Sequence, residues 1–101
     1  MRSLAALLCL IAAPALAGDG GRAAQLEHLV VQDCGSCHGL TFRGGLGSPL
    51  TRAALEGYAP EGLAQVILDG IPGTAMPPWR PLLSKADALW IADYLLKGDR
   101  E

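Results

Sequence analysis

The sequence lacks any run of like charges and any excess of basic residues. Eight lysines and arginines stand against ten aspartates and glutamates, which gives a formal net charge of −2 at pH 7. Proteins that hold nucleic acids or anionic membrane surfaces through charge present a basic patch or a basic balance. We therefore expect no nucleic-acid partner and no attachment to an anionic lipid surface.

The chain also lacks an apolar run long enough to span a bilayer, which takes about 20 residues. The apolar stretch 4–13 follows Arg2 and precedes the small-residue motif Ala-Leu-Ala at 15–17, a pattern typical of an export signal. We expect cleavage after this motif, so that 1–17 is a signal peptide and 18–101 forms one domain in the periplasm. No stable membrane insertion is expected; a retained signal acting as a short anchor is the alternative.

Cysteine is scarce, with three residues in the chain. Cys9 falls inside the expected signal, and Leu8 stands where a lipid-modified cysteine would need a small residue before it. We expect Cys9 to be removed with the signal. The remaining pair is too little for the disulfide framework that stabilises many small exported domains. A single domain of this size has a modest core and usually needs a cofactor or another staple.

The remaining two cysteines belong to the motif Cys-Gly-Ser-Cys-His at 34–38. C-x-x-C-H is the attachment signature of a c-type haem. The thiols of Cys34 and Cys37 can add to the two vinyl groups on one porphyrin edge, and the adjacent imidazole of His38 reaches the iron as an axial ligand. The motif predicts one covalently attached haem c. A thioredoxin-like thiol pair and half of a zinc site remain as alternatives.

Methionine and histidine are also few, which narrows the search for a second axial ligand. Beyond the expected signal the chain has one methionine, Met76, and one further histidine, His28. Met76 stands in the proline-flanked segment Ala-Met-Pro-Pro-Trp, far enough beyond His38 for the chain to pass round the haem edge. His28 lies six residues before Cys34, too close to reach the opposite haem face. We predict Met76 as the distal ligand and keep His28 as the weaker alternative.

Three further residues are candidates to tune such a site. The Pro49 carbonyl, in the segment Gly-Ser-Pro-Leu, is placed to accept the Nδ1 proton of His38 and so fix its tautomer. Trp79 and Arg80 are candidates to bond the haem propionates, Trp79 through its indole N–H and Arg80 by charge. An ordinary turn, core packing and a solvated surface are the respective alternatives.

No segment alternates apolar and polar residues as a half-buried strand would. Apolar spacing and local stop signals predict helices over 22–33, 60–69 and from Ser84 to Gly98, with a short one over 51–57. Residues 18–21 are predicted to be a flexible leader, and 71–81, with four prolines, to be irregular. The fold class is therefore predicted to be all-α, with long loops that can wrap a cofactor.

Taken together, these features resemble class I cytochrome c. They are C-x-x-C-H after an N-terminal helix, a Gly-x-Pro-Leu segment, a proline-flanked methionine and a last helix that carries aromatic residues. The likeness covers 18–101. It implies a compact fold around one covalently attached haem, with the first and last helices crossing near Trp90 and Tyr94.

Three segments resemble more closely the small periplasmic cytochromes c-55X: C-G-S-C-H-G-L-T at 34–41, G-G-L-G-S-P-L-T at 44–51 and I-L-D-G-I-P-G-T-A-M-P-P-W-R-P at 67–81. That family is associated with denitrification and the cytochrome cd nitrite reductase system. The resemblance implies an electron carrier, not an enzyme, that donates electrons to this reductase or helps to mature its haem d. A haem enzyme or gas sensor with a labile sixth ligand is the alternative.

Overall fold

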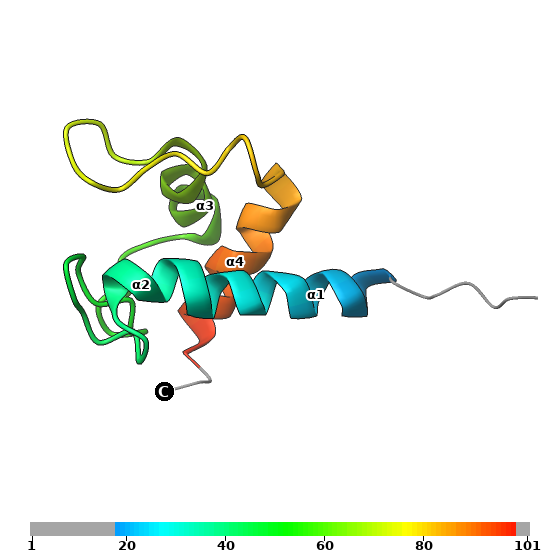
Figure 1. The fold of residues 1–101 in the computed structure, drawn as a ribbon, viewed down its shortest axis with the longest axis horizontal. Coiled ribbons are helices and arrows are strands. Elements are labelled where there is room, and N and C mark those ends of the chain that lie inside the picture. The colour runs from blue at the N-terminus through cyan, green and yellow to red at the C-terminus, as the bar shows by residue number, and fades with distance from the viewer. Residues whose placement is uncertain (1–17, 99–101) are drawn as a thin grey trace, which may run out of the picture.

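The computed structural model describes residues 18–98 as a helical protein, with no strand in that range. Its elements are α1 (Gly18–Leu29), η1 (Val30–Cys34), α2 (Gly35–His38), α3 (Pro60–Asp69) and α4 (Lys85–Lys97). Figure 1 shows α1 continuing into α2 as one rod, with α3 above it and α4 running across it. The predicted all-α class is confirmed for these residues, while the expected signal, 1–17, lies outside them. None of the described helices is long and apolar enough to cross a membrane.

The continuous helical rod formed by α1, η1 and α2 extends beyond the predicted helix 22–33 at both ends. The prediction of a flexible leader over 18–21 is wrong, because α1 already begins at Gly18. A glycine costs a helix only about 1 kcal/mol relative to alanine, which the following turns can offset. At the other end the amide of Gly35 donates to the carbonyl of Val30, five residues back, so the π-helical turn η1 carries the chain into α2. The chain therefore reaches His38 as one continuous helical rod.

The ends of α3 and α4 lie where the local signals predict them. Pro60 occupies the first turn of α3, where a missing N–H costs nothing, and Gly70 caps its C-terminus. Ser84 caps α4 in a complete capping box: its hydroxyl accepts from Asp87 N at 3.0 Å, and Asp87 Oδ2 accepts from Ser84 N at 3.0 Å. Gly98 follows α4 with a left-handed φ of 63°.

The short helix predicted over 51–57 is not formed, and the segment makes successive turns instead. Thr51 begins these turns, since its Oγ1 accepts from Ala54 N at 3.2 Å and its carbonyl accepts from Leu55 N at 3.0 Å. Leu55 is the one buried side chain of the segment. A stretch much shorter than about 12 residues, with so little apolar surface to bury, does not sustain a helix.

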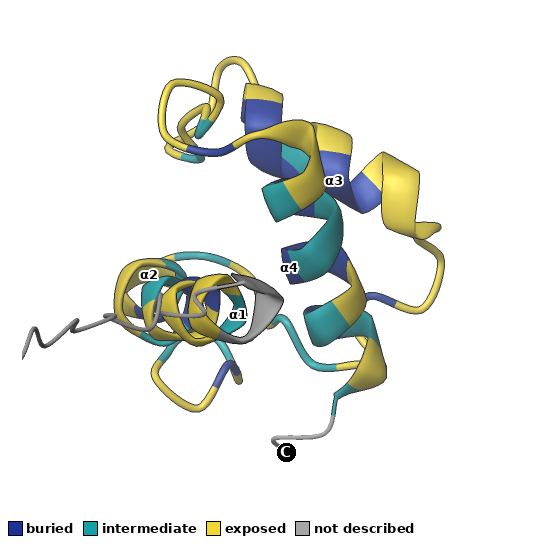
Figure 2. Cartoon of the chain, turned by 90° about the vertical axis from the view of Figure 1, so that its right-hand side faces the viewer, coloured by how far each residue is buried: buried dark blue, intermediate teal, exposed yellow. Residues whose placement is uncertain are grey.

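The core is apolar and centres on α3 and α4, which pack against each other (Figure 2). No polar or charged side chain is buried among the described residues. The α1 rod, the turns after it and both long helices contribute to one cluster, made of Leu26, Val30, Phe42, Leu55, Leu63, Ala64, Ile67, Leu68, Leu83, Ala88, Ile91, Ala92 and Leu95. Hydrophobic burial therefore joins α4 both to α3 and to the α1 rod.

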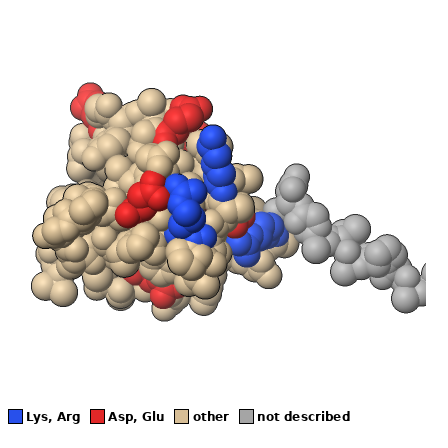
Figure 3. Space-filling model, turned by 90° about the horizontal axis from the view of Figure 1, so that it is seen from above, with Lys and Arg blue, Asp and Glu red and all other residues tan. Residues whose placement is uncertain are grey.

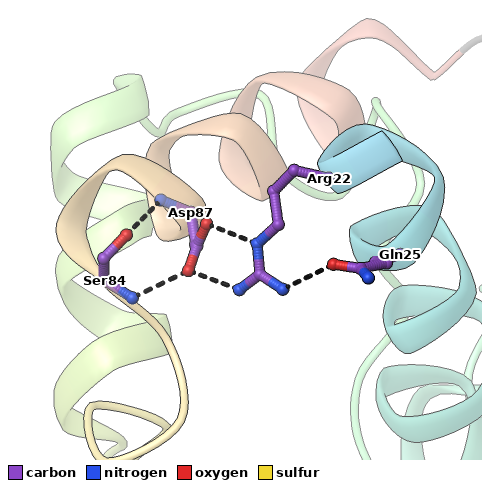
Figure 4. Close-up of polar contacts among 4 residues, drawn as sticks. All are labelled: Arg22, Gln25, Ser84 and Asp87. Carbon is purple, nitrogen blue, oxygen red and sulfur yellow. Dashed lines mark hydrogen bonds and ion pairs between the residues drawn. The ribbon is translucent and has the colours of Figure 1, made fainter. Parts of the chain in front are cut away.

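Two polar contacts hold α1 across α4. The guanidinium of Arg22 forms a forked pair with Asp87, with Nη2–Oδ2 at 2.7 Å and Nε–Oδ1 at 3.0 Å (Figure 4). Tyr94 Oη donates to Glu27 Oε2 at 2.6 Å, and the Tyr94 ring stacks on Trp90 with centroids 5.0 Å apart. The predicted crossing of the first and last helices near Trp90 and Tyr94 is confirmed.

Asp87 forms hydrogen bonds both with α1 and with the residue that caps α4. Replacing it should therefore lower the free energy of unfolding by an amount that depends on pH. Its hydrogen bond from Arg22 lowers the pKa of Asp87 from 3.8 to about 2. A carboxylate with a depressed folded-state pKa stabilises the protein above its unfolded pKa, and that contribution disappears as pH falls toward the folded value. At pH 7, Asp87→Ala should lower the free energy of unfolding by about 1–2 kcal/mol, since one of the two capping-box hydrogen bonds and an ion pair are lost. The difference from the parent protein should shrink between pH 4 and pH 2, as measured by urea unfolding.

Asp93→Ala is the matched control, because Asp93 forms an exposed pair with Lys97 on the same helix, at 3.3 Å. It should change the free energy of unfolding by less than about 0.5 kcal/mol. Equal effects of the two substitutions would show that the Arg22–Asp87 contact does not stabilise the crossing.

Candidate functional site

The C-x-x-C-H motif occupies the last turns of the α1 rod. Cys34 closes η1, and Cys37 and His38 lie in α2. Residues three apart on a helix are surface neighbours, so both thiols are presented on one side of the rod. Cys34 is half-buried, Cys37 is exposed, and neither forms a disulfide. The two sulfurs are therefore available to a single group at the end of the rod.

The environment of Cys34 disfavours the thiolate form of its side chain. Burial, with smaller effects from the charges of Asp33 and Cys37, raises the pKa of Cys34 to about 11. Thiol–disulfide chemistry depends on the thiolate, which such a thiol provides sparingly at neutral pH. This disfavours the thioredoxin-like interpretation of the pair.

His38 has one ring nitrogen committed and one left for a ligand. Its Nδ1 lies 2.7 Å from the carbonyl oxygen of Ser48. A carbonyl only accepts, so Nδ1 carries the proton, and in the neutral imidazole Nε2 then keeps its lone pair. The prediction that the Pro49 carbonyl accepts this proton is therefore wrong, because the acceptor is the carbonyl of the preceding residue, Ser48. The amide of Gly47 donates to Cys37 O at 2.7 Å, and this contact sets the loop register so that Ser48 faces the ring.

Gly47 also supports the imidazole from beside it. A Cβ atom built at Gly47 would lie 2.9 Å from both Cε1 and Nδ1 of His38, closer than real Cβ contacts come. The backbone of Gly47 thus packs directly on the ring. No role in the site was predicted for Gly47; its place two residues before Pro49, in a segment expected to contact His38, was the available signal.

A zinc site is not supported by the surrounding side chains. Across residues 18–98, no group of three or more His, Cys, Asp or Glu side chains converges on a point that could hold a metal ion. The donor set at the rod's end is instead two thiols and one imidazole with a free Nε2. This set fits covalent attachment of a porphyrin and ligation of its iron from one side.

Met76 lies half-buried in the irregular loop 71–79 that follows α3. Its amide donates to Thr74 Oγ1 at 3.2 Å, and its carbonyl accepts from Ile71 N at 3.2 Å. Figure 1 shows this loop (yellow) at the same end of the molecule as α2 and the loop after it. His28 lies on α1 and is exposed. Ligation of an iron by Met76 stays a prediction.

The two candidate propionate contacts occupy the return of this loop. Trp79 is half-buried and packs against the core, and its backbone amide donates to Ile67 O at 3.1 Å. Arg80 pairs with Asp69, with Nε–Oδ1 at 2.8 Å and Nη2–Oδ1 at 2.7 Å. The guanidinium is thus engaged at the end of α3. Contacts of Trp79 and Arg80 with the haem propionates stay predictions. The ion pair between Arg80 and Asp69 was not predicted from the sequence.

Sequence comparison relates the chain to haem proteins. The family described as "Cytochrome C oxidase, cbb3-type, subunit III" matches residues 21–95. The chain is 62% identical over 103 residues to cytochrome c55X of Paracoccus denitrificans (strain Pd 1222), covering all of both chains. It is 54% identical over 81 residues to cytochrome c55X of Pseudomonas aeruginosa, covering 80% of this chain and 68% of that protein.

Comparison with solved structures also relates the chain to c-type cytochromes. The c-type cytochrome NirC matches with a TM-score of 0.78 at 54% identity, over 81% of this chain and 96% of that one. A dihydro-heme d1 dehydrogenase, NirN, in complex with DHE matches with a TM-score of 0.65 at 36% identity. That match covers 69% of this chain and 15% of NirN, so the likeness concerns a small part of the larger protein.

The contact between Gly47 and His38 can be tested by adding one carbon. In Gly47→Ala the new Cβ forces the ring or the loop to move, so the free energy of unfolding of the haem-loaded protein should fall by about 1–3 kcal/mol. Gly62→Ala is the control: nothing lies within 4 Å of a Cβ there, and Gly62 is inside α3. It should be neutral or stabilise by up to about 1 kcal/mol. Denaturant unfolding measures both, and equal stabilities would contradict the packing described.

Proposed function

The chain belongs to the cytochrome c55X family of c-type cytochromes, and from this premise we propose that it is a periplasmic monohaem electron carrier. Membership confirms the predicted cytochrome fold. In the proposal one haem c is attached through Cys34 and Cys37, and its iron is bound by His38 and Met76. Bound haem supplies one-electron cycling between Fe(III) and Fe(II). The protein itself holds, orients and shields it.

The observation that supports this proposal most strongly is the hydrogen bond from His38 to Ser48. It leaves Nε2 as the ring nitrogen with a lone pair, and it fixes the orientation of the ring. Metal-binding histidines generally donate their other N–H to an acceptor in this way, which raises the basicity of the ligand. Packing of Gly47 on the ring further limits its motion.

Met76 suits the distal position because its loop is stiff and lies at the same end of the molecule as α2 (Figure 1). Pro77 and Pro78 restrict the backbone directly after it, so less conformational entropy is lost when its side chain is held in one place. A thioether favours Fe(II) relative to a second imidazole and therefore raises the reduction potential. A filled sixth position favours electron transfer over the alternative of a gas sensor or haem enzyme.

The proposed partners are redox proteins of nitrite respiration, with cytochrome cd nitrite reductase as the first candidate. A second candidate role follows from the likeness to NirN, a dihydro-heme d1 dehydrogenase. In that role the protein accepts the electrons released when the haem d precursor is dehydrogenated. Both roles use the same one-electron chemistry and differ in the direction of flow.

The surface near the proposed haem site carries little charge. The loops 39–51 and 71–79 contain one charged residue between them, Arg43. Leu40 is 68% exposed and Leu46 is 94% exposed in the first of these loops. In Figure 3, acidic and basic side chains are interspersed over the upper face, while most of the left-hand end is uncharged. A partner that docks at this end would be held by apolar contact more than by charge.

Substitution of Met76 tests the proposed ligation directly. Met76→Ala should keep the haem attached, as intact mass will show, lower the reduction potential and let the reduced protein bind carbon monoxide. Met76→His should also lower the potential while excluding carbon monoxide, since a second imidazole fills the site. The matched control is His28→Ala, which should leave the visible spectrum and the potential unchanged. An unaltered spectrum in Met76→Ala, or an altered one in His28→Ala, would show that Met76 is not the ligand.

The partner proposal predicts electron transfer with weak salt dependence. Reduced protein should be oxidised by purified cytochrome cd nitrite reductase, and the rate should vary by less than about threefold between 20 and 200 mM salt, since few charges face the partner. Oxidised protein mixed with a dihydro-haem d1 dehydrogenase and its substrate tests the second role in the same stopped-flow instrument. Transfer in that assay alone would assign the maturation role, and transfer in neither would overturn both.

A further inference from the structure

The loop that carries Met76 leaves α3 at Gly70 and folds back over that same residue. A Cβ atom built at Gly70 would lie 2.6 Å from Met76 O, 2.7 Å from Pro77 C and 2.8 Å from Pro78 N. All three are backbone atoms, which cannot swing aside as the end of a side chain can. The segment after the predicted ligand therefore rests on the bare backbone of Gly70.

The backbone conformation of Gly70 also requires a residue without a side chain. Its φ is 68° and its ψ −170°, a combination open almost only to glycine. This conformation reverses the chain at once after α3, so that the loop starts on the side to which it later returns. Both the dihedral angles and the close approach thus require a residue without a side chain.

The end of the loop, where the chain returns to α3, is fixed to that helix by backbone hydrogen bonds. Trp79 N donates to Ile67 O at 3.1 Å, and Arg80 N donates to Leu68 O at 3.0 Å. These carbonyls lie in the last turn of α3, where no further helical amide is available to them. The loop cannot move away from Gly70 without leaving them unpaired. The Arg80–Asp69 ion pair adds a side-chain brace at the same place.

We propose that Gly70 is a positioning residue for Met76: its missing side chain lets the loop 71–79 lie against the end of α3, and this sets the distance of the thioether from the haem iron. The inference rests on the proposed function, in which Met76 is the distal ligand. A side chain at position 70 lifts the Met76–Pro78 backbone and weakens the bond between Met76 and the iron. Cys34, Cys37 and His38 hold the haem independently of this loop.

Gly70→Ala tests this in the full-length protein with its haem attached. Carbon monoxide reaches the reduced iron only in molecules whose sixth site is open, so its apparent affinity follows that open fraction. Gly70→Ala should raise the affinity at least about tenfold, weaken the methionine–iron charge-transfer band of the oxidised protein and lower the reduction potential. Intact mass should show unchanged haem attachment.

Gly73→Ala is the matched control within the same loop. Gly73 also has a positive φ, of 83°, but nothing lies within 4 Å of a Cβ there. Gly73→Ala therefore introduces the same kind of backbone strain as Gly70→Ala but no contact with Met76–Pro78. The carbon monoxide affinity of Gly73→Ala should change by less than about threefold. Equal changes in the two variants would overturn the inference.

A milder pair of variants covers the case in which Gly70→Ala yields no folded protein. Asp69→Asn removes the brace to Arg80 without adding a side chain at position 70, and should raise carbon monoxide affinity about twofold to fivefold. Asp93→Asn removes a similar exposed pair on α4 and should leave it unchanged. In that case, equal carbon monoxide affinities of Asp69→Asn and Asp93→Asn would overturn the inference.

Met76→Ala separates this inference from the function on which it depends. If that variant binds carbon monoxide and Gly70→Ala does not, Met76 is the ligand but Gly70 does not position it. If Met76→Ala leaves the spectrum unchanged, the proposed ligation itself fails, and the role of Gly70 fails with it.

Discussion

The crossing of α1 over α4 is the contact on which the rest of the structure depends. The α1 rod continues without interruption to His38, so whatever fixes the rod against α4 also fixes both cysteines and the imidazole. Leu26 and Val30 bury apolar surface at this crossing, and Arg22 and Glu27 reach Asp87 and Tyr94 across it. Asp87 at the same time completes the capping box that starts α4. One carboxylate therefore couples the start of the last helix to the placement of the first.

The proposed site is shaped on both sides by glycines that admit backbone where a side chain would collide. Gly47 lies against the His38 ring, and Gly70 lies against the backbone of Met76–Pro78. On each side a backbone hydrogen bond then sets the register, from Gly47 to Cys37 and from Trp79 to Ile67. The residues proposed to bind the iron are thus positioned by main-chain contacts more than by side-chain packing. This economy suits a small domain with a modest core.

The sequence predicts the parts of this protein that local chemistry determines. The bounds of α3 and the capping box at Ser84 follow from residues within one turn of each other, and the motif at 34–38 carries its meaning in five adjacent residues. The misses at the candidate site involve contacts between segments that are separated in the sequence. Ser48, not Pro49, faces His38 because Gly47 bonds to Cys37, and Arg80 is paired with Asp69 because the loop returns to α3. No periodicity encodes such contacts, since they depend on where loops close.

The π-helical turn η1 has a consequence for which sequence lengths the fold tolerates. A π-turn holds one residue more than the α-helical turn that it replaces. Each residue of an α-helix rotates the next by about 100°, so removing one residue from 30–34 would leave a helix of good geometry whose far end had turned by that angle. The face packed on α4 would stay in place while the C-x-x-C-H motif pointed elsewhere. Substitutions within this segment are therefore easier to accommodate than a change in its length. The number of residues between Leu26 and Cys34 determines the direction in which the motif faces.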